Sequence, residues 1–287
     1  MKHPRMRSLR RNFRFPQKIL LYFVLSLLAA FCLVPLYWLV RSSFMRSTDI
    51  YLISPLIWWP KEMLWNNYFE AIKFMKFLQK TYNTLVILVG NMAGAAITSC
   101  MAGYAFSRVK WQGRQICFFI LLTSMMLPGT VTIIPQYLIW AKLGFVDTYV
   151  PLILPAFFGG GAFNIFLLRQ FFLSVPKDLD EAATIDGAGH IWIFTRIIVP
   201  LAKPAIMVIC LFIFLGCWND FFGPLIYLNS QNKFTLALGL LQFRGHYSTR
   251  WNWVMAASTI VVIPCIIMYI FTQRRLIEGI ALTGLKS

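Results

Sequence analysis

Long hydrophobic stretches alternate with shorter polar segments along most of this chain of 287 residues. Five stretches carry no charged residue and reach or exceed the roughly 20 residues that an apolar helix needs to cross a lipid bilayer. They are residues 19–40, 81–107, 115–141, 148–168 and 251–273. A sixth stretch, 204–219, is too short unless the helix tolerates Asp220 and continues to residue 228. The pattern therefore predicts an all-α integral membrane protein with about six transmembrane helices.

Helix-breaking residues lie within the third and fourth stretches. Four prolines fall between residues 126 and 155, and Gly159-Gly160-Gly161 follows. Such residues persist at membrane depth where neighbouring helices or a cavity satisfy the freed backbone groups. We therefore expect either broken, short helices around a pathway or ordinary proline kinks in a packed bundle.

The first hydrophobic stretch is longer than the roughly 7–15 apolar residues of a secretory signal, and no small-x-small cleavage site follows it. We therefore interpret it as a retained span. Residues 41–80 mix charges with tryptophans, which predicts an external loop that contains an interfacial helix around residues 62–77. The predicted domains are a basic tail (1–18), the first span (19–40), this loop (41–80), a core of five further spans (81–273) and a second tail (274–287).

Composition and charge support the membrane assignment and suggest its orientation. Hydrophobic residues make up 59% of the chain and the mean hydropathy is +0.66, outside the usual range of soluble domains. The net charge of +17 would suit a nucleic-acid ligand, but inner-membrane proteins concentrate Lys and Arg in cytoplasmic segments. With the N-terminus inside, 17 of the 27 Lys and Arg residues fall on the cytoplasmic side. We therefore predict cytoplasmic N- and C-termini and location in the bacterial cytoplasmic (inner) membrane.

Few residues suit catalysis or metal binding. The six cysteines all lie in hydrophobic stretches and the three histidines are far apart, which predicts neither a disulfide framework nor a metal site. The chain has no G-x-x-x-x-G-K-[ST] phosphate-binding loop, so we do not expect it to hydrolyse ATP. A membrane-embedded enzyme would need paired carboxylates, or a nucleophile and a base, at one membrane face. The one cluster of acids instead lies in a loop at residues 169–203, and we predict that the chain is not an enzyme and has no catalytic residue.

Four of the ten acidic residues lie within nine positions of this loop: Asp178, Asp180, Glu181 and Asp186. We expect a short helix that begins near Pro176 and ends at Gly187, and a second helix over residues 190–198 that ends at Pro200. Asp178, Glu181 and Ile185 would share one face of the first helix. Helices this short are marginal in water, so packing or a partner should hold them. From spacing alone, the loop is either a docking surface or a solvated connector.

The spacing in this loop resembles the EAA loop of ABC-importer permeases. Glu181-Ala182-Ala183 is followed after three residues by Gly187, and after nine more by Ile197-Ile198-Val199-Pro200, where the family usually has Leu at the place of Val199. Further segments resemble the carbohydrate branch of that family, and most of all the second permease of maltose-type and oligosaccharide-type systems. They are "IFLLRQFFLSVP" (165–176), "PLAKPA" (200–205), "CWNDFFGPL" (217–225), "FTLALGL" (234–240) and "QRRLIEGIALTGLKS" (273–287). The resemblance runs from about residue 20 to the end of the sequence.

This resemblance implies the type I ABC-importer permease fold and the binding-protein-dependent import of a sugar, a di- or oligosaccharide. The EAA loop would enter a cleft of a separate cytoplasmic ATPase, which binds ATP and Mg²⁺, and this chain would bind no cofactor. The implied ATPase contacts are Glu181, Ala182, Ala183, Asp186, Gly187, Ile197 and Pro200. The implied partners are a second homologous permease in a heterodimer, two ATPase subunits, an extracytoplasmic substrate-binding protein, the sugar and membrane lipid, and no nucleic acid.

Asp220 is the one acid that would lie inside a predicted span, because the sixth stretch is long enough only if its helix continues past Asp220. Ionisable residues within a membrane usually face a cavity or a partner. Trp218, Asn219 and Asp220 could contact a sugar on a translocation pathway. Alternatively, Asp220 could pair with a basic or amide group and lock two helices together.

The resemblance also suggests contacts at the two membrane faces. The external segment 229–252 would meet the binding protein, with Lys233, Arg244, His246 and Arg250 as candidate contacts. The tail would approach the ATPase interface through Gly279, Gly284 and Lys286.

Two alternatives are left open. A proton-coupled secondary transporter could use Asp220 as its relay, but it leaves the acidic loop unexplained. An ABC permease for a non-sugar solute is the nearer alternative, and the carbohydrate-like segments disfavour it.

Overall fold

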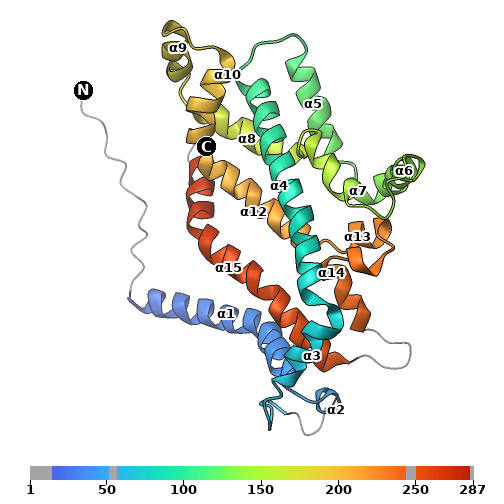
Figure 1. The fold of residues 1–287 in the computed structure, drawn as a ribbon. Coiled ribbons are helices and arrows are strands. Elements are labelled where there is room, and N and C mark those ends of the chain that lie inside the picture. Colours follow the sequence, from blue (N-terminus) through green and yellow to red (C-terminus); the bar gives the residue numbers. More distant parts are fainter. Residues whose placement is uncertain (1–14, 52–56, 244–249, 285–287) are drawn as a thin grey trace.

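The computed structural model describes residues 15–51, 57–243 and 250–284, with side chains to residue 273, and every regular element within these ranges is a helix (Figure 1). In chain order the helices are α1 (Phe15–Ser43), α2 (Ser47–Ile50), α3 (Asn66–Met75), α4 (Phe77–Ser107), α5 (Arg114–Ser124), α6 (Gly129–Lys142), α7 (Val150–Ile153), η1 (Leu154–Phe157), α8 (Ala162–Ser174), α9 (Asp178–Ile185), α10 (His190–Ile193), η2 (Phe194–Ile198), α11 (Val199–Leu201), α12 (Lys203–Trp218), α13 (Phe222–Tyr227), η3 (Gln231–Lys233), α14 (Leu236–Gly239), η4 (Leu240–Phe243) and α15 (Trp251–Gly284). α4 runs through the middle of the molecule, from α3 at one end to the region of α9 and α10 at the other (Figure 1).

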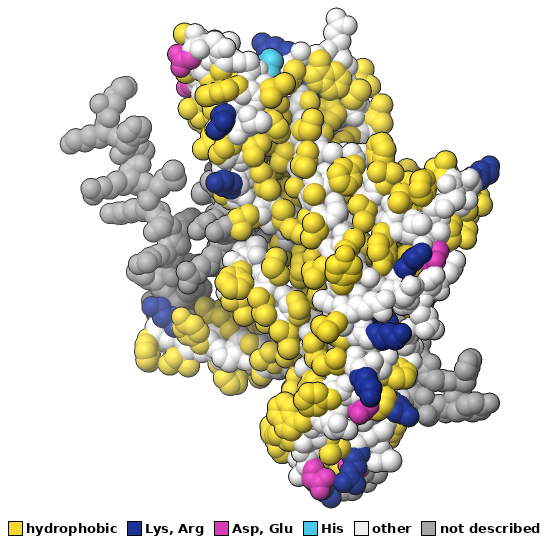
Figure 2. All heavy atoms as spheres, viewed as in Figure 1, with side chains coloured by type: hydrophobic (Ala, Val, Ile, Leu, Met, Phe, Trp, Pro, Cys, Tyr) yellow, Lys and Arg dark blue, Asp and Glu magenta, His cyan; other side chains and the backbone are white. Residues whose placement is uncertain are grey.

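Four helical segments of the described chain are long and apolar enough to cross a membrane: Phe15–Ser43, Phe77–Ser107, Val150–Ser174 and Trp251–Gln273. Two bent pairs bring the number to six if each pair forms one span: Arg114–Ser124 with Gly129–Lys142, and His190–Leu201 with Lys203–Trp218. The predicted all-α membrane fold with about six spans is confirmed. Hydrophobic side chains also cover most of the face drawn in Figure 2, as contact with lipid requires.

The third hydrophobic stretch, residues 115–141, is broken rather than continuous. α5 ends at Ser124, α6 begins at Gly129, and their axes differ by 99°. Pro128 between them has extended backbone angles (φ −61°, ψ 131°), and a proline also keeps the residue before it out of the helical region. A single straight span here is therefore wrong, whereas the expected helix break in the proline-rich region is confirmed.

A second break divides the fourth stretch at Gly159-Gly160-Gly161, between η1 and α8. All three glycines have positive φ (96°, 67° and 94°), which glycine adopts without steric cost. A Cβ on Gly160 would lie 2.5–2.7 Å from backbone atoms of Ala95 in α4, so the two segments touch directly. The Asn91 side chain of α4 donates to the carbonyl of Leu152 (2.8 Å). α4 thus satisfies a backbone group beside the broken span, as a membrane interior requires.

The sixth stretch does not continue through Asp220. α12 stops at Trp218, and α13 is a separate helix. The Asp220 carboxylate accepts the backbone N–H of Gly223 (3.0 Å), and Asp side chains favour such local bonds over helix continuation. The extension that the sequence predicts beyond Asp220 is therefore wrong. The additional length lies on the other side, where the segment His190–Leu201 precedes α12 at an angle of 74°.

Two hydrophobic clusters hold the helices together, and α4 and α12 contribute to both. One cluster joins α3, α4, α12, α14, η4 and α15 around Trp218. The other joins α4, α8, α9, α10, η2 and α12 around Phe172. α1 differs from the other long helices. It packs against α15, but its apolar side chains between Phe15 and Tyr37 are exposed. In Figure 1 it extends away from the rest of the molecule.

Candidate functional site

The acidic loop forms two short helices at one end of the molecule, at the top of Figure 1. α9 begins soon after Pro176 and carries three acids in its first turn, where the positive end of the helix dipole favours them. Gly187 follows its last turn with a φ of +86°. The N–H groups of Gly187 and Ala188 donate back to the carbonyls of Thr184 and Ala183 (3.0 and 2.9 Å), the Schellman pattern of a glycine-terminated helix. The first predicted helix and its stop are therefore confirmed.

The second helix of the loop is longer than predicted and does not end at Pro200. α10 continues through a π-helical turn, η2, into α11. The N–H of Val199 closes that turn by donating to the carbonyl of Phe194. Pro200 has no N–H to donate, but it lies at the start of α11, where the loss costs little. The chain turns instead at Ala202, directly before α12.

An open hollow of about 550 Å³ lies between α9 and the following helix. It is lined by Leu179, Ala182, Ala183, Asp186, Gly187, Ala188, Gly189, Trp192 and Ile197. Of the seven residues that the resemblance implies as ATPase contacts, five are in this lining, and Glu181 and Pro200 are exposed outside it. The fold therefore gathers the candidate residues at one surface, and their role stays a prediction.

Hydrophobic side chains and carboxylates are both exposed on the helices that form this hollow. Ile185 and Ile191 are 86% and 81% exposed, and Trp192 is also exposed. Asp178 and Glu181, which were expected to share a face with Ile185, are exposed as well. Exposed apolar side chains with a polar rim are typical of protein interaction sites. The arrangement suits a partner that brings an apolar element and a basic group.

A buried guanidinium anchors α9 to the rest of the molecule. Arg108, directly after α4, donates from Nη1 to the Asp180 carboxylate (3.0 Å), and its side chain is only 3% exposed. It also donates to the carbonyls of Phe172 (Nε, 3.2 Å) and Val175 (Nη2, 2.5 Å), at the C-terminal end of α8. One side chain thus satisfies carbonyl groups at a helix end and holds the first turn of α9.

Sequence reasoning missed this anchor. Arg108 counted there only as one of many cytoplasmic charges, and Asp180 only as a member of the acidic cluster. The two residues are 72 positions apart, and no local pattern connects them. Ala183, Ile193 and Ile198, which are buried in the second hydrophobic cluster, complete the attachment of the loop.

The three candidate pathway residues lie in different environments. Trp218 is 4% exposed, and its indole N–H donates to the carbonyl of Val261 in α15 (3.0 Å). Asn219 is exposed and donates to the carbonyl of Leu215 in its own helix. The Asp220 carboxylate accepts the backbone N–H of Gly223 in its own next turn (3.0 Å). Their contact with a substrate stays a prediction.

The candidate binding-protein contacts are only partly described. Lys233 forms an ion pair with Asp147 (3.0 Å), and the Arg250 guanidinium lies over the ring of Trp253 (4.2 Å). Arg244, His246 and Lys286 lie outside the described residues, and Gly279 and Gly284 lie in the last turns of α15. Within the described part of the chain, no group of three His, Cys, Asp or Glu side chains could hold a metal ion.

Comparison with known families shows which class of membrane protein this chain belongs to. Residues 90–281 match the family described as the binding-protein-dependent transport system inner membrane component. The chain belongs to this family. It is therefore a permease subunit of an ABC importer and a multi-pass protein of the inner membrane, and the proton-coupled carrier is set aside.

Two relatives and one solved structure are similar to this permease over most of its length. The trehalose/maltose transport system permease protein of Thermococcus litoralis is 32% identical over 273 residues, which are 94% of this chain and 97% of that protein. The sn-glycerol-3-phosphate transport system permease protein of Brucella abortus (strain 2308) is 32% identical over 258 residues, 87% of this chain and 90% of that protein. The crystal structure of a bacterial ABC transporter involved in the import of the acidic polysaccharide alginate has a TM-score of 0.78 at 24% identity, over 91% of this chain and 98% of that chain. The structural match confirms the ABC-importer permease fold.

Proposed function

We propose that this permease imports a sugar, a di- or oligosaccharide, and that a separate ATPase drives it by docking on the loop formed by α9 and α10. The observation that carries the proposal is the hollow at that loop, which is lined by alanines and glycines together with exposed Trp192, on helices that also expose Ile185 and Ile191. An apolar surface of this kind favours a protein partner. Glu181 beside it offers a carboxylate to a basic group, and Ala182 lets the partner come close.

In this mechanism the permease converts a push on α9 into movement of its spans. Two ATPase subunits bind ATP and Mg²⁺ and close, which presses on α9. Because Arg108 ties α9 to α4 and α8, the force reaches a helix of 31 residues that contacts the broken fourth span. The spans would then tilt between inward-facing and outward-facing arrangements.

The remaining partners follow from the same proposal. A second, homologous permease completes the pathway, and an extracytoplasmic binding protein delivers the sugar to the end opposite α9. The excess of Lys and Arg in the predicted inside segments supports cytoplasmic termini and a cytoplasmic α9. The exposed apolar face of α1 would contact lipid or the second permease.

The substrate class rests on the carbohydrate-like segments and on relatives such as the trehalose/maltose permease. A phosphorylated polyol is the alternative substrate, because a permease named for sn-glycerol 3-phosphate has the same sequence identity to this chain as the trehalose/maltose permease. The two substrates differ in charge, so the loaded binding protein can distinguish them directly.

The test is ATPase activity of the whole complex in nanodiscs, with its binding protein and a panel of di- and oligosaccharides and sn-glycerol 3-phosphate. Ala182→Phe places a large side chain in the hollow and should weaken docking by roughly ten-fold or more, as overpacked contacts do. Thr184→Phe is the matched control, because Thr184 is exposed on the same helix outside the hollow. Glu181→Lys should likewise remove stimulation while the permease pair still assembles.

Equal stimulated activity in the Ala182→Phe and Thr184→Phe complexes would refute docking at the hollow. Stimulation by sn-glycerol 3-phosphate and by no sugar would replace the proposed substrate and leave the docking proposal intact.

A further inference from the structure

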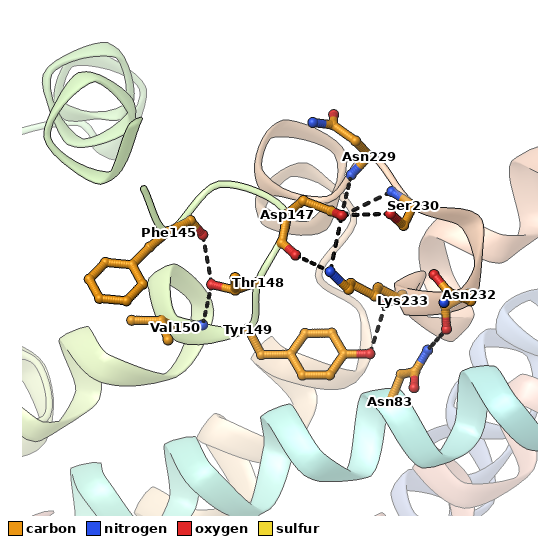
Figure 3. Close-up of polar contacts among 10 residues, drawn as sticks. All are labelled: Asn83, Phe145, Asp147, Thr148, Tyr149, Val150, Asn229, Ser230, Asn232 and Lys233. Atoms are coloured by element: carbon orange, nitrogen blue, oxygen red, sulfur yellow. Dashed lines mark hydrogen bonds and ion pairs between the residues drawn. The ribbon is translucent and has the colours of Figure 1, made fainter. Parts of the chain in front are cut away.

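A second polar cluster joins the loop between α6 and α7 to the segment that follows α13 (Figure 3). We call the cluster of Asp147, Asn229, Ser230 and Lys233 the clasp. The Asp147 carboxylate accepts the N–H groups of Asn229 (3.0 Å) and Ser230 (2.9 Å), the Ser230 hydroxyl (2.5 Å) and the Lys233 ammonium (3.0 Å). Four donors from one loop therefore converge on a single side chain of the other.

The backbone of the two loops is joined as well. The N–H of Asp147 donates to the carbonyl of Tyr227 (2.7 Å), and the Tyr149 hydroxyl donates to the carbonyl of Lys233 (3.2 Å). Asp147 has a φ of +60°, a left-handed conformation that Asp tolerates better than most residues but that is uncommon outside glycine. A residue held there by contacts on both sides is a fixed point between the loops.

The clasp is also tied to the start of α4. The Asn83 side chain donates to the carbonyls of Asn232 (2.7 Å) and Phe234 (3.0 Å), and the N–H of Leu236 donates to the Thr84 hydroxyl (2.9 Å). Asn83 and Thr84 are both buried. The segment that carries Lys233 is thus held on the first turns of the same helix that reaches Arg108.

The positions of the two loops show what the clasp connects. The loop with Asp147 lies between α6, in the bent pair α5–α6, and α7, at the start of the span Val150–Ser174 that the three glycines interrupt. The other loop begins the segment 229–252 that is expected to meet the binding protein, and residues 229–243 of it lie in the described part of the chain. Donation by the Ser230 hydroxyl, then by the backbone N–H groups of Ser230 and Asn229 and by Lys233, holds the pKa of Asp147 far below its ordinary value. The carboxylate is therefore charged at every working pH.

We infer that Asp147 and Lys233 are positioning residues for import: they transmit the docking of a loaded binding protein on residues 229–243 to the bent pair α5–α6 and to the span formed by α7, η1 and α8. This inference rests on the proposed function, because it needs a binding protein that acts at this end. The ion pair is partly exposed, with side chains 26% (Asp147) and 38% (Lys233) exposed, and such pairs contribute little to folding. Its loss should therefore leave the permease assembled and alter the response to the binding protein.

The experiment measures ATPase activity of the full complex against the concentration of sugar-loaded binding protein. Asp147→Asn and Lys233→Met should each lower the maximal stimulation by about five-fold or more, a typical coupling between distant sites. The double variant should lose no more than Asp147→Asn alone, because Lys233→Met removes a contact that the loss of the carboxylate already breaks. In Asp147→Asn, basal activity and the half-saturating concentration should stay within about two-fold of wild type.

Two matched variants keep the test decisive. Lys142→Met removes an exposed lysine at the end of α6, beside the clasp loop, and should respond as wild type. Lys233→Arg retains the charge and should recover most of the stimulation. Loss of basal activity and assembly in Asp147→Asn and Lys233→Met, without recovery in Lys233→Arg, would make the clasp a folding contact and overturn the inference.

Other outcomes separate the possible failures. Full stimulation of both clasp variants would also overturn the inference and leave the proposed function standing. A raised half-saturating concentration in Lys233→Met alone would show that Lys233 contacts the binding protein directly, and this also contradicts transmission through the clasp. A wild-type complex that responds to no loaded binding protein would refute the proposed function itself.

Discussion

A buried ion pair lies at one end of α4, whereas the segment held at its other end carries a partly exposed ion pair. At the C-terminal end, Arg108 is buried and reaches α8 and α9 with a single guanidinium. Near the N-terminal end, Asn83 and Thr84 hold a segment whose own ion pair, Asp147–Lys233, remains partly open to solvent. Residues 83 and 108 are separated by roughly 37 Å along a straight helix at about 1.5 Å per residue.

The difference separates two functions that one helix can serve. A buried charge is costly to leave unpaired, so the Arg108 end must move together with α9. A partly exposed pair held mainly by backbone N–H groups can be weakened without unfolding. We therefore expect substitutions at the Arg108 end to affect stability and substitutions at the clasp to affect regulation.

Arg108→Met should have the largest effect. It leaves the carboxylate of Asp180 and the carbonyl of Val175 without their donor, and loss of one partner of a buried pair costs roughly 3–5 kcal/mol. The measurement is thermal unfolding of the purified complex. The matched control is Arg46→Met, whose ion pair with Glu62 is exposed on both sides and should matter by less than about 1 kcal/mol. Equal stability of the two variants would remove the contrast between the ends.

Gly160→Ala should have an intermediate effect, because it separates the middle of α4 from the broken fourth span. The new Cβ would meet backbone atoms of Ala95 at 2.5–2.7 Å, and the φ of +67° disfavours any side chain. We expect a loss of roughly 1–3 kcal/mol in unfolding free energy, with loss of coupling between the two ends. Gly216→Ala is the control, since nothing lies within 4 Å of its Cβ position in α12. If both alanine variants unfold alike and couple normally, the middle contact does not join the ends.

The smallest expected effect is that of pH on the clasp. Because the folded pKa of Asp147 is lowered, the stability it contributes is fully present above its unfolded value of about 3.9 and is lost only as pH falls through the folded pKa. Burial, and then the charge of Asp147, raises the pKa of Tyr149. Its hydroxyl therefore keeps the proton that it donates to the carbonyl of Lys233. The ratio of stimulated to basal ATPase activity should therefore change in parallel for wild type and Asp147→Asn between about pH 5 and pH 8. A ratio that falls with acidification only in wild type would show that the carboxylate titrates in this range.

Local patterns in the sequence predict the fold class and the first helix of the acidic loop. Run length identifies the spans, and Gly187 marks the end of α9, where a left-handed residue is needed. The structure differs where two parts of the chain compete for one group. Asp220 lies after the end of a helix instead of within it, and its carboxylate accepts the N–H of Gly223.

The anchors at both ends of α4 lay beyond sequence reasoning. Arg108 and Asp180 are 72 residues apart, and Lys233 and Asp147 are 86 apart. A lysine in an external loop looks the same in sequence whether it faces solvent or binds a carboxylate, and Lys233 was expected to be free for a binding protein. Only the approach of two distant loops distinguishes these cases.

The exposure of α1 has a consequence for how its sequence can vary. Its apolar side chains from Phe15 to Tyr37 contact little of their own chain, so no neighbouring groove in this subunit selects their shapes. Leucine, isoleucine and phenylalanine should be interchangeable there as long as the helix remains hydrophobic. In α4, by contrast, adding one methyl group at Gly94 would collide with the ring of Phe157. The first helix should therefore tolerate mutation better than the central helix does. The match to the family begins at residue 90, well beyond the first helix.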